Sequence, residues 1–373
     1  MKERSRAWIA FSVLALLAGC SPEVAAPDDE QAPASGQLRL GAVLGDTDLS
    51  GFSRADKPRQ FTFPADHGAH PSFRSEWWYL TLVLSDADSE EIGVQFTLFR
   101  QALTADPVPS ANRWQSNQVY LAHLALVDVA SGQHLARERF ARGHPALAGV
   151  RADPFSLWLE DWRIDAGEEQ WRLAAGTADM AVDVVLGNAV EPVLQGDRGF
   201  SRKGPDQASY YYSMPRLPVS GRVMVDGRFR EVTGLGWLDR EWSTSVLSDA
   251  QVGWDWFALQ LDDGRSAMAY QLRRQDGQRD THDQGILVAE DGTSRRLSAA
   301  EFTLTPTRFW EDEEGVDWPV AWTVNVGEEV WRVEAALDDQ IMRTTIRYWE
   351  GMVSVRDEAG HRIGRGYLEL TGY

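Results

Sequence analysis

The stretch EWWYLTLVLSDADSEEIGVQFTLFR, residues 76–100, indicates the fold class of this chain. Two runs rich in aromatic and aliphatic residues, 76–84 and 92–100, flank the polar segment Ser85–Asp88. Runs of this length and composition on either side of a turn are typical of two β-strands joined as a hairpin. The stretch therefore predicts β structure with large apolar side chains facing an interior.

The same strand–turn–strand pattern recurs along the rest of the chain. Asp226-Gly227 separates the runs 221–225 and 228–232, and this dipeptide is a strong signal for a two-residue hairpin turn. Further strand-like runs cover residues 119–129, 155–164, 170–174, 254–261, 266–272, 322–326, 330–335, 348–355 and 365–371. Many short strands at near-regular spacing, with little helical periodicity, predict an all-β fold of antiparallel barrels or sandwiches.

The first twenty residues have the pattern of an export signal. Three basic residues precede an apolar run, Ala7–Leu17, that is shorter than the roughly 20 residues of a membrane span. The next positions, Leu17-Ala18-Gly19-Cys20, resemble a bacterial lipobox, in which small residues precede a thiol that can be acylated. We expect residues 1–19 to be a lipoprotein signal peptide and Cys20 to carry lipid. The alternative is an ordinary secretory signal with a chance cysteine.

The segment after the signal predicts a tether and a location. Cys20 is the only cysteine, so no disulfide can form within the chain. Residues 22–33, in which alanine, proline and acidic residues dominate, have too few apolar residues to fold, and we expect a tether over residues 20–50. By the sorting rule that accompanies the lipobox resemblance, Ser21 favours the outer membrane. We expect a cell-envelope protein, lipid-anchored at the periplasmic face of the outer membrane.

The acidic composition excludes one class of partner. The chain has 37 Lys and Arg residues against 56 Asp and Glu, a net charge of −19. Such a surface repels nucleic acid and anionic headgroups, so acyl chains rather than a basic patch must provide membrane attachment. The sequence has no Gly-x-Ser-x-Gly, P-loop or dinucleotide-binding motif. We therefore expect no nucleic-acid partner and no cofactor.

Histidines and carboxylates cluster in the segment before the first strong strand. Asp66, His67, His70 and Glu76 are residue types that ligate metals. They fall in a loop that contains glycine and proline, where no regular helical face sets the ligand geometry. The alternative is a loop whose histidines form hydrogen bonds over the mouth of a barrel, and we expect no metal.

The run Trp237–Trp242, WLDREW, places two carboxylates two positions apart. Strand alternation puts Asp239 and Glu241 on one face and Arg240 on the other. Two carboxylates near tryptophans can share a proton, because repulsion and desolvation raise one pKa, and a general acid needs such a group. The alternative is a charge cluster at a barrel rim, in which Arg240 pairs with one carboxylate.

Three consecutive tyrosines, Tyr210–Tyr212, form a third constellation. In a strand they point alternately to the two faces, so at least one can line a cavity, and packing in the core or rim is the alternative. We expect Tyr212 to assist Asp239 and Glu241 by hydrogen bonding. These three residues are the candidate catalytic set.

Several of these motifs together resemble one protein family. The resemblance is carried by His67-Gly68-Ala69-His70-Pro71, Glu76-Trp77-Trp78-Tyr79, Tyr211-Tyr212-Ser213, Gly236-Trp237-Leu238-Asp239-Arg240-Glu241-Trp242, Gly253-Trp254-Asp255-Trp256-Phe257, Tyr348-Trp349-Glu350-Gly351 and Gly366-Tyr367-Leu368-Glu369-Leu370-Thr371-Gly372-Tyr373. Through these motifs, in this order, the chain from about Phe61 to the C-terminus is similar to the AttH-like proteins, which are related to carotenoid 1,2-hydratase (hydroxyneurosporene synthase).

The resemblance implies two lipocalin-like antiparallel barrels in tandem and an apolar ligand. We expect an N-terminal domain over residues 51–245 and a C-terminal domain over 246–373, with a boundary as early as residue 219 as the alternative. The expected ligand-binding residues are His70, Glu76, Trp78, Trp242, Trp254 and Trp256.

Two functions remain open at this point. The first is a lipid-binding or isoprenoid-binding lipoprotein that serves an ABC-transporter permease or envelope maintenance, because family members are often encoded with such a permease. The second is a hydratase (a hydro-lyase) or isomerase acting on a carbon–carbon double bond of an isoprenoid-like substrate. The hydratase branch has a His-Asn-Trp pattern where this chain has Arg240-Glu241-Trp242, so the reaction is less firmly implied than the fold.

Overall fold

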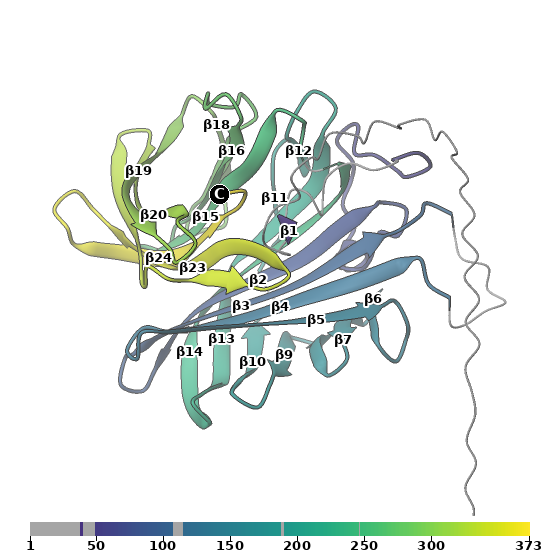
Figure 1. Ribbon diagram of the computed structural model, residues 1–373, viewed down its shortest axis with the longest axis horizontal. Coiled ribbons are helices and arrows are strands. Elements are labelled where there is room, and N and C mark those ends of the chain that lie inside the picture. The colour runs from purple at the N-terminus through teal and green to yellow at the C-terminus, as the bar shows by residue number, and fades with distance from the viewer. Residues whose placement is uncertain (1–37, 40–48, 107–114, 188–189, 246) are drawn as a thin grey trace, which may run out of the picture. The chain divides into compact units, whose positions relative to one another are not determined.

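The computed structural model describes residues 38–39, 49–106, 115–187, 190–245 and 247–373. Within these residues the chain forms 24 β-strands and one 3-10 turn, η1 (Ala65–His67). Figure 1 shows how the strands are arranged. The predicted all-β class is confirmed. Among the described residues no helix is long and apolar enough to cross a membrane. The predicted signal peptide and Cys20 lie outside the described residues.

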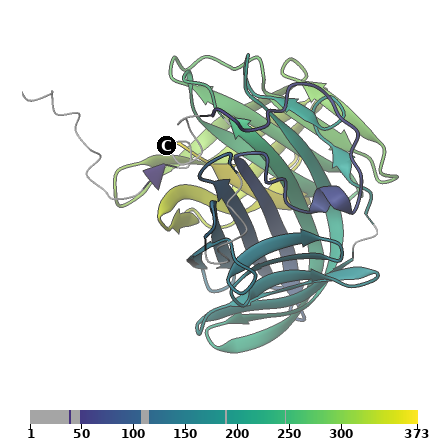
Figure 2. The same ribbon diagram turned by 90° about the vertical axis from the view of Figure 1, so that its right-hand side faces the viewer.

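The N-terminal sheet contains thirteen strands in the order β5-β4-β3-β2-β14-β13-β10-β9-β8-β7-β6, with β11 and β12 paired to β13. Its strands are β2 (Ser75–Asp86), β3 (Glu91–Ala102), β4 (Gln118–Asp128), β5 (Gln133–Arg142), β6 (Ala148–Ala152), β7 (Phe155–Leu159), β8 (Trp162–Ala166), β9 (Gln170–Gly176), β10 (Met180–Gly187), β11 (Val193–Leu194), β12 (Phe200–Arg202), β13 (Ala208–Val225) and β14 (Arg228–Ser245). All of its pairs are antiparallel. Because β4 and β5 also contact β7, the two ends of the sheet meet and it is nearly closed (Figure 2).

The C-terminal sheet follows the order β18-β17-β16-β15-β24-β23-β21-β20-β19, with β1 and β22 paired to β23. Its strands are β1 (Leu38–Arg39), β15 (Gln251–Leu261), β16 (Ser266–Arg274), β17 (Gln284–Val288), β18 (Ser294–Ser298), β19 (Phe302–Glu311), β20 (Asp317–Val326), β21 (Glu329–Ala335), β22 (Ile341–Arg343), β23 (Ile346–Arg356) and β24 (Arg362–Leu370). Only β1 runs parallel to its described neighbour. The chain passes from one sheet to the other between Ser245 and Gln251.

The burial of each strand reflects where it lies in the sheet. In β10, Met180, Val182, Val184 and Leu186 are buried and the residues between them are half-buried, so this strand has one interior face. In β2, by contrast, nearly every residue from Ser75 to Leu84 is buried. A strand buried on both faces has a continuous apolar sequence, and this explains the unbroken apolar character of the 76–84 run.

The second buried face of β2 packs against the C-terminal sheet. One buried apolar cluster joins Tyr79 and Trp237 of the N-terminal sheet to Trp256, Met352 and Tyr367 of the C-terminal sheet. Figure 1 shows β23 and β24 beside β2 and β3, and these strands are in contact. The two sheets therefore meet through their outer faces, while each encloses a hydrophobic core of its own.

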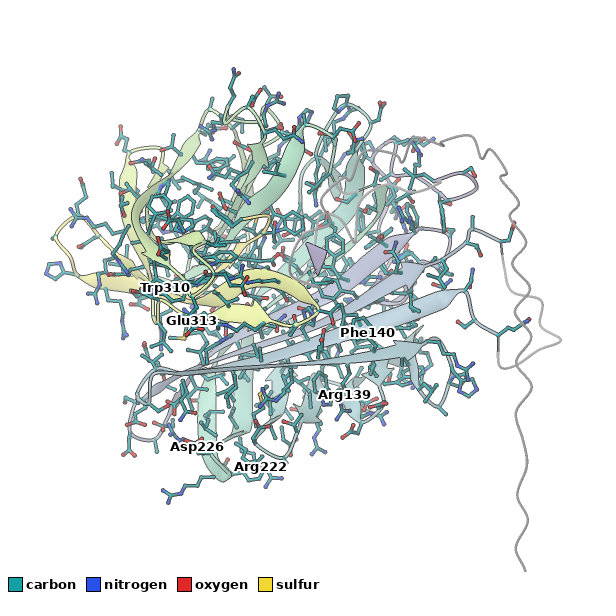
Figure 3. All side chains as sticks on the ribbon, in the orientation of Figure 1. Arg139, Phe140, Arg222, Asp226, Trp310 and Glu313 are labelled. Carbon is teal, nitrogen blue, oxygen red and sulfur yellow. The ribbon has the colours of Figure 1, made fainter. Side chains whose placement is uncertain are left out.

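Elsewhere the outer faces of the sheets meet solvent. In Figure 3, Phe140 on the edge strand β5 and Asp226 at the turn between β13 and β14 are labelled on this outer surface, and Phe140 is 56% exposed. Ion pairs on such a surface, for example Arg222 with Asp183, contribute little to stability. The interactions that organise the molecule are those between and inside the sheets.

The close approach of the sheets requires a glycine in β3. A Cβ atom at Gly93 would lie 2.5 Å from the Tyr367 hydroxyl and 3.2 Å from Met352 Cβ. We predict that Gly93→Ala lowers the free energy of unfolding by about 1–3 kcal/mol, as overpacking does. Adding Tyr367→Phe should recover part of this loss, because the obstructing oxygen is removed. Urea denaturation of the single and double variants measures both effects.

The matched control is Gly187→Ala in β10, where the nearest atoms to the added Cβ all belong to the Pro218 ring, the closest being Cδ at 3.3 Å. This variant should be much less destabilised than Gly93→Ala. Equal stability of Gly93→Ala and the unmodified protein would contradict the packing described here.

Candidate functional site between the two sheets

A cavity lies where the outer faces of the two sheets meet. The N-terminal sheet and its loops contribute Trp77, Tyr79, Phe99, Lys203, Tyr211, Asp239 and Glu241, and the C-terminal sheet contributes Trp254, Trp256, Tyr270, Leu272, Tyr348 and Glu369. The free space among these side chains is about 60 Å³. This space is large enough for a few water molecules, and it is smaller than the roughly 300–1,000 Å³ of a typical ligand pocket.

Strand register explains why Asp239 and Glu241 reach this cavity. Both lie on β14 and alternate with Arg240, so they share one face. Their partners on the neighbouring strand β13 are Ser213 and Tyr211 respectively. Directly opposed residues in antiparallel strands project to the same side of the sheet, so Tyr211 faces the cavity with them.

Three hydrogen bonds hold the Asp239 carboxylate in place. Trp237 Nε1 donates to Oδ1 over 2.7 Å, the Ser213 hydroxyl also donates to Oδ1, and the Tyr211 hydroxyl donates to Oδ2. Burial raises the pKa of Asp239 to about 7, since it outweighs these three donors, and the charge of Glu241 adds to the rise. Near neutral pH this group is therefore divided between its acid and its carboxylate form.

Glu369 supplies a second acid from the opposite wall. Trp254 Nε1 donates a hydrogen bond to Glu369 Oε1 over 2.9 Å. Burial raises the pKa of Glu369 to about 8; the Trp254 hydrogen bond and Lys203 oppose this rise, and the charges of Asp239 and Glu241 add to it. Most of the Glu369 carboxyl is therefore protonated at neutral pH. A protonated carboxyl that faces a cavity can give its proton to a bound molecule.

Lys203 places a cation in the same cavity. Its ammonium group forms an ion pair with Glu241. The Nζ atom also lies 5.6 Å from the centre of the Trp77 ring and 5.8 Å from that of Tyr270. Aromatic faces attract cations at these distances, so the walls of the cavity favour positive charge.

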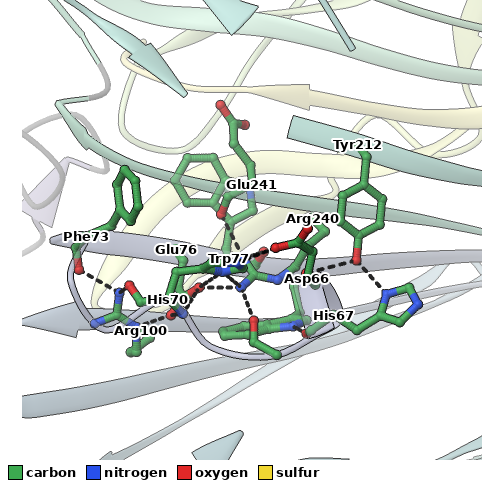
Figure 4. Close-up of polar contacts among 12 residues, drawn as sticks. Asp66, His67, His70, Phe73, Glu76, Trp77, Arg100, Tyr212, Arg240 and Glu241 are labelled. Atoms are coloured by element: carbon green, nitrogen blue, oxygen red, sulfur yellow. Dashed lines mark hydrogen bonds and ion pairs between the residues drawn. The ribbon is translucent and has the colours of Figure 1, made fainter. Parts of the chain in front are cut away.

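A separate polar network fills the inner side of β2 and β14 (Figure 4). Glu76, fully buried, forms ion pairs with Arg100 and Arg240, and its carboxylate accepts a hydrogen bond from the backbone N–H of His70. Burial alone would raise the pKa of Glu76, but the Arg240 and Arg100 guanidiniums hold it well below its usual range. The Arg240 guanidinium in turn lies 3.8 Å from the centre of the Trp78 ring. Glu76 is therefore an ionised structural anchor.

The histidines of the 66–79 segment close this network. The His70 ring stacks on Trp242 with centroids 3.8 Å apart, and its Nε2 lies 3.1 Å from Asp66 Oδ1. His67 Nδ1 is 2.6 Å from the Tyr212 hydroxyl. Burial and the nearby charge of Arg240 lower the pKa of His67 to about 4, so its ring is neutral. Among the residues that the structure describes, no group of three or more His, Cys, Asp or Glu side chains is arranged to hold a metal.

The structure divides the predicted site residues between these two places. Asp239, Glu241, Trp254 and Trp256 line the cavity between the sheets. The others lie in the polar network or pack beside it, on the inner face of the N-terminal sheet, and do not line the cavity: His70, Glu76, Trp78, Tyr212 and Trp242. The pairing of Arg240 with Asp239 or Glu241, considered as an alternative, is wrong, because Arg240 pairs with Glu76 and Lys203 pairs with Glu241.

The expected role of Tyr212 is corrected by a bulge. The register set by the Asp226-Gly227 hairpin, extended unchanged, would put Tyr212 opposite Glu241. An irregularity between Met214 and Leu217 shifts the pairing by one residue, so Tyr211 takes that place and Tyr212 faces inward. Sequence reasoning also missed Lys203 and Glu369, since each comes from a segment distant in sequence and carries no motif that implies a cavity.

The raised pKa of Glu369 generates a prediction about stability. The pKa of Glu369 is about 8 in the folded protein and 4.5 in the unfolded chain, so its protonation favours the folded state. This contribution to the free energy of unfolding is complete below pH 4.5 and is lost as the pH rises to about 8. Glu369→Gln should therefore flatten the decline in unfolding free energy between pH 5 and 8, by at most about 1.4 kcal/mol per pH unit. Urea midpoints across this range test the effect.

The matched control is Glu358→Gln at an exposed turn of the same sheet, which should leave the pH dependence unchanged.

The lowered pKa of Glu76 affects stability in the opposite sense to that of Glu369: its contribution to the free energy of unfolding is present above about pH 4.5 and is lost only on acidification. A Glu369→Gln protein with the pH profile of the unmodified protein would contradict a raised pKa at this position.

Comparison with solved structures supports the fold. A putative AttH from Nitrosomonas europaea is 34% identical, with a TM-score of 0.76, and the match covers 86% of this chain and all of that one. Kievitone hydratase from Nectria haematococca is 14% identical, with a TM-score of 0.61 over 86% of this chain and 98% of its own. CghA in complex with Sch210972 is 10% identical, with a TM-score of 0.51 over 91% and 99%. At these last two identities the likeness shows the fold alone.

Comparison by sequence identifies the family. No protein of curated function matches the chain. The model of the AttH-like family matches residues 54–373, which include nearly every described strand. The resemblance found in the motifs is thereby confirmed, and the chain belongs to the AttH-like family.

Proposed function

We propose that the protein binds an apolar, unsaturated, isoprenoid-like molecule between its two sheets and acts as a hydratase or isomerase on a carbon–carbon double bond. The observation that carries this proposal is a pair of buried acids, Asp239 and Glu369, in an aromatic cavity, with pKa values near 7 and 8. Such acids can both give and take protons at neutral pH. One structural neighbour is named a hydratase, which agrees with this class of reaction.

The proposed step begins with proton transfer from Glu369. Its O–H bond breaks as the double-bond electrons form a C–H bond, and positive charge develops on the adjacent carbon. The faces of Trp254, Trp256 and Tyr270 stabilise this charge. In a hydratase, water then forms a C–O bond and its surplus proton goes to the Asp239 carboxylate. In an isomerase, Asp239 removes a proton from a neighbouring carbon and no water is added.

A ligand of this kind needs more room than the present cavity provides. Trp77 and Trp254 line it and are only half-buried, whereas Trp256 and Tyr211 are buried. In our proposal the Trp77 and Trp254 side chains turn outward to admit the ligand. Asp239 keeps its place meanwhile, because Ser213 and Trp237 bond to it from within the N-terminal sheet.

A non-catalytic carrier is the second candidate. It is favoured by the absence of histidine among the described residues that line the cavity, together with Arg240 standing where the hydratase branch has a histidine. In this reading the acids recognise a hydroxyl or amine on a lipidic ligand. An ABC-transporter permease is the partner that we propose for such a carrier.

Isotope incorporation separates these functions. The purified protein is incubated with a panel of acyclic isoprenoid alkenes and alcohols in D₂O and in H₂¹⁸O, and the products are analysed by mass spectrometry. A hydratase incorporates one deuterium on carbon and one ¹⁸O, an isomerase incorporates no ¹⁸O, and a carrier binds ligands without incorporation. We expect the first result.

We further predict that Glu369→Gln and Asp239→Asn each lower turnover by roughly a hundredfold or more, because each removes a group that moves a proton. Glu358→Gln on the exposed turn is the control and should keep full turnover. Full activity of both cavity variants, or a folded protein that neither binds nor converts any member of the panel, would overturn the proposal.

We also propose that acylated Cys20 holds the protein on the periplasmic face of the outer membrane. Cys20→Ala should then move the protein from the membrane fraction to the soluble periplasmic fraction, because no other anchor is expected. Immunoblotting of fractions after a high-salt wash measures this shift. Persistence of the alanine variant in washed membranes would show that another feature anchors it.

A further inference from the structure

A second carboxyl lies directly beside Glu369, outside the cavity lining. Glu350 on β23 and Glu369 on β24 are opposed residues of an antiparallel pair. Their side chains therefore project side by side from the same face of the C-terminal sheet. Glu350 is only 1% exposed, whereas Glu369 borders the cavity. The two carboxyls are therefore neighbours, with Glu369 at the cavity and Glu350 buried behind it.

No guanidinium or ammonium group neutralises Glu350. Within the described part of the chain it forms no ion pair, and neither of its carboxyl oxygens forms a hydrogen bond of good geometry, although the Tyr79 and Tyr348 hydroxyls lie close to it. The Tyr79 and Tyr348 hydroxyls lower the pKa of Glu350 in part, but burial and the charge of Glu369 raise it well above its usual range. Glu76, equally buried, is ionised because two arginines contact it.

The groups that face the pair come from both sheets. They are Tyr79 on β2, Asp239 and Glu241 on β14, Lys203 after β12, Tyr348 on β23 and Tyr367 on β24. Only Lys203 is cationic, and it is already paired with Glu241. Two adjacent buried carboxyls that together lack a cation cannot both ionise at moderate cost.

We infer that Glu350 and Glu369 act as one acid pair, in which Glu350 stays protonated and its O–H turns to donate a hydrogen bond to the neighbouring Glu369 carboxylate after Glu369 has given up its proton. Glu350 is therefore a positioning residue, and its role in turnover rests on the proposed function of Glu369. No proton is lost from Glu350 in the step: its O–H bond remains and only its hydrogen-bond acceptor becomes charged. Formation of this hydrogen bond stabilises the Glu369 carboxylate as its charge develops.

Infrared spectroscopy tests the pair without any substrate. The C=O stretch of protonated carboxyls is followed against pH in the full chain, with Glu350→Gln, Glu369→Gln and the exposed control Glu358→Gln alongside. In the unmodified protein we expect one buried carboxyl to lose its proton near pH 8 and the second to keep it well beyond. In Glu369→Gln the remaining carboxyl, Glu350, should ionise at a pH lower by on the order of one unit or more, because the repulsion is gone.

The two single variants, Glu350→Gln and Glu369→Gln, each leave one carboxyl of the pair to be titrated alone. If one of them fails to fold, as circular dichroism would show, the other still reports the carboxyl that remains. Loss of both protons below pH 7 in the unmodified protein, or a Glu350 band that titrates at the same pH with and without Glu369, would overturn the pair.

Activity measurements separate this inference from the proposed function. If isotope incorporation is found, Glu350→Gln should lower kcat more than it changes KM and should shift the pH–rate profile. A coupled infrared titration with no turnover of any ligand would leave the pair intact and refute the catalytic proposal. Turnover that depends on Glu369, with uncoupled infrared titrations, would leave the function intact and refute the pair.

Discussion

The structure depends on the packing of the two sheets through their outer faces. A strand buried on one side can direct polar residues outward, but β2, β14, β15 and β24 are buried on both sides where the sheets meet. Carboxyl groups that alternation would otherwise place in water are therefore enclosed between aromatic rings. Desolvation of a carboxylate is costly, so an enclosed acidic side chain either forms an ion pair with a cation or stays protonated to a higher pH.

The molecule uses both solutions, one on each side of the N-terminal sheet. On the inner face of β2 and β14, Glu76 has Arg100 and Arg240 beside it and is ionised. On the outer side, Lys203 forms its ion pair with Glu241 and only partly offsets the effect of burial on Glu369, so Asp239 and Glu369 keep their protons to higher pH. The same residue types thus serve as a structural anchor on one face and as candidate acids on the other. The number of cations within reach decides between these roles.

Part of this arrangement is readable in the sequence. The 76–100 run predicts the hairpin of β2 and β3, and the spacing of Asp239 and Glu241 predicts that they share a face. Strand periodicity is a local property, so it can be recognised in the sequence without knowledge of the tertiary structure. The turn chemistry of Asp226-Gly227 is local in the same sense.

The rest depends on contacts between distant segments. The bulge near Arg216, which has a φ of 62°, reverses which tyrosine faces the cavity, and the expected role of Tyr212 fails for that reason. The choice of Glu76 as the partner of Arg240 joins residues 164 positions apart. Glu369 becomes an acid only because the N-terminal sheet covers it. Alternation in one strand contains none of this information.

Neutron diffraction from crystals equilibrated in deuterated buffer near neutral pH would test the central claim most directly, because it locates the exchangeable hydrogen on each carboxyl. We expect deuterium on Glu369 and on Glu350, and none on the Glu76 carboxylate between its two arginines. Glu369 and Glu350 both found without deuterium would contradict the claim that the junction of the sheets keeps its enclosed acids protonated.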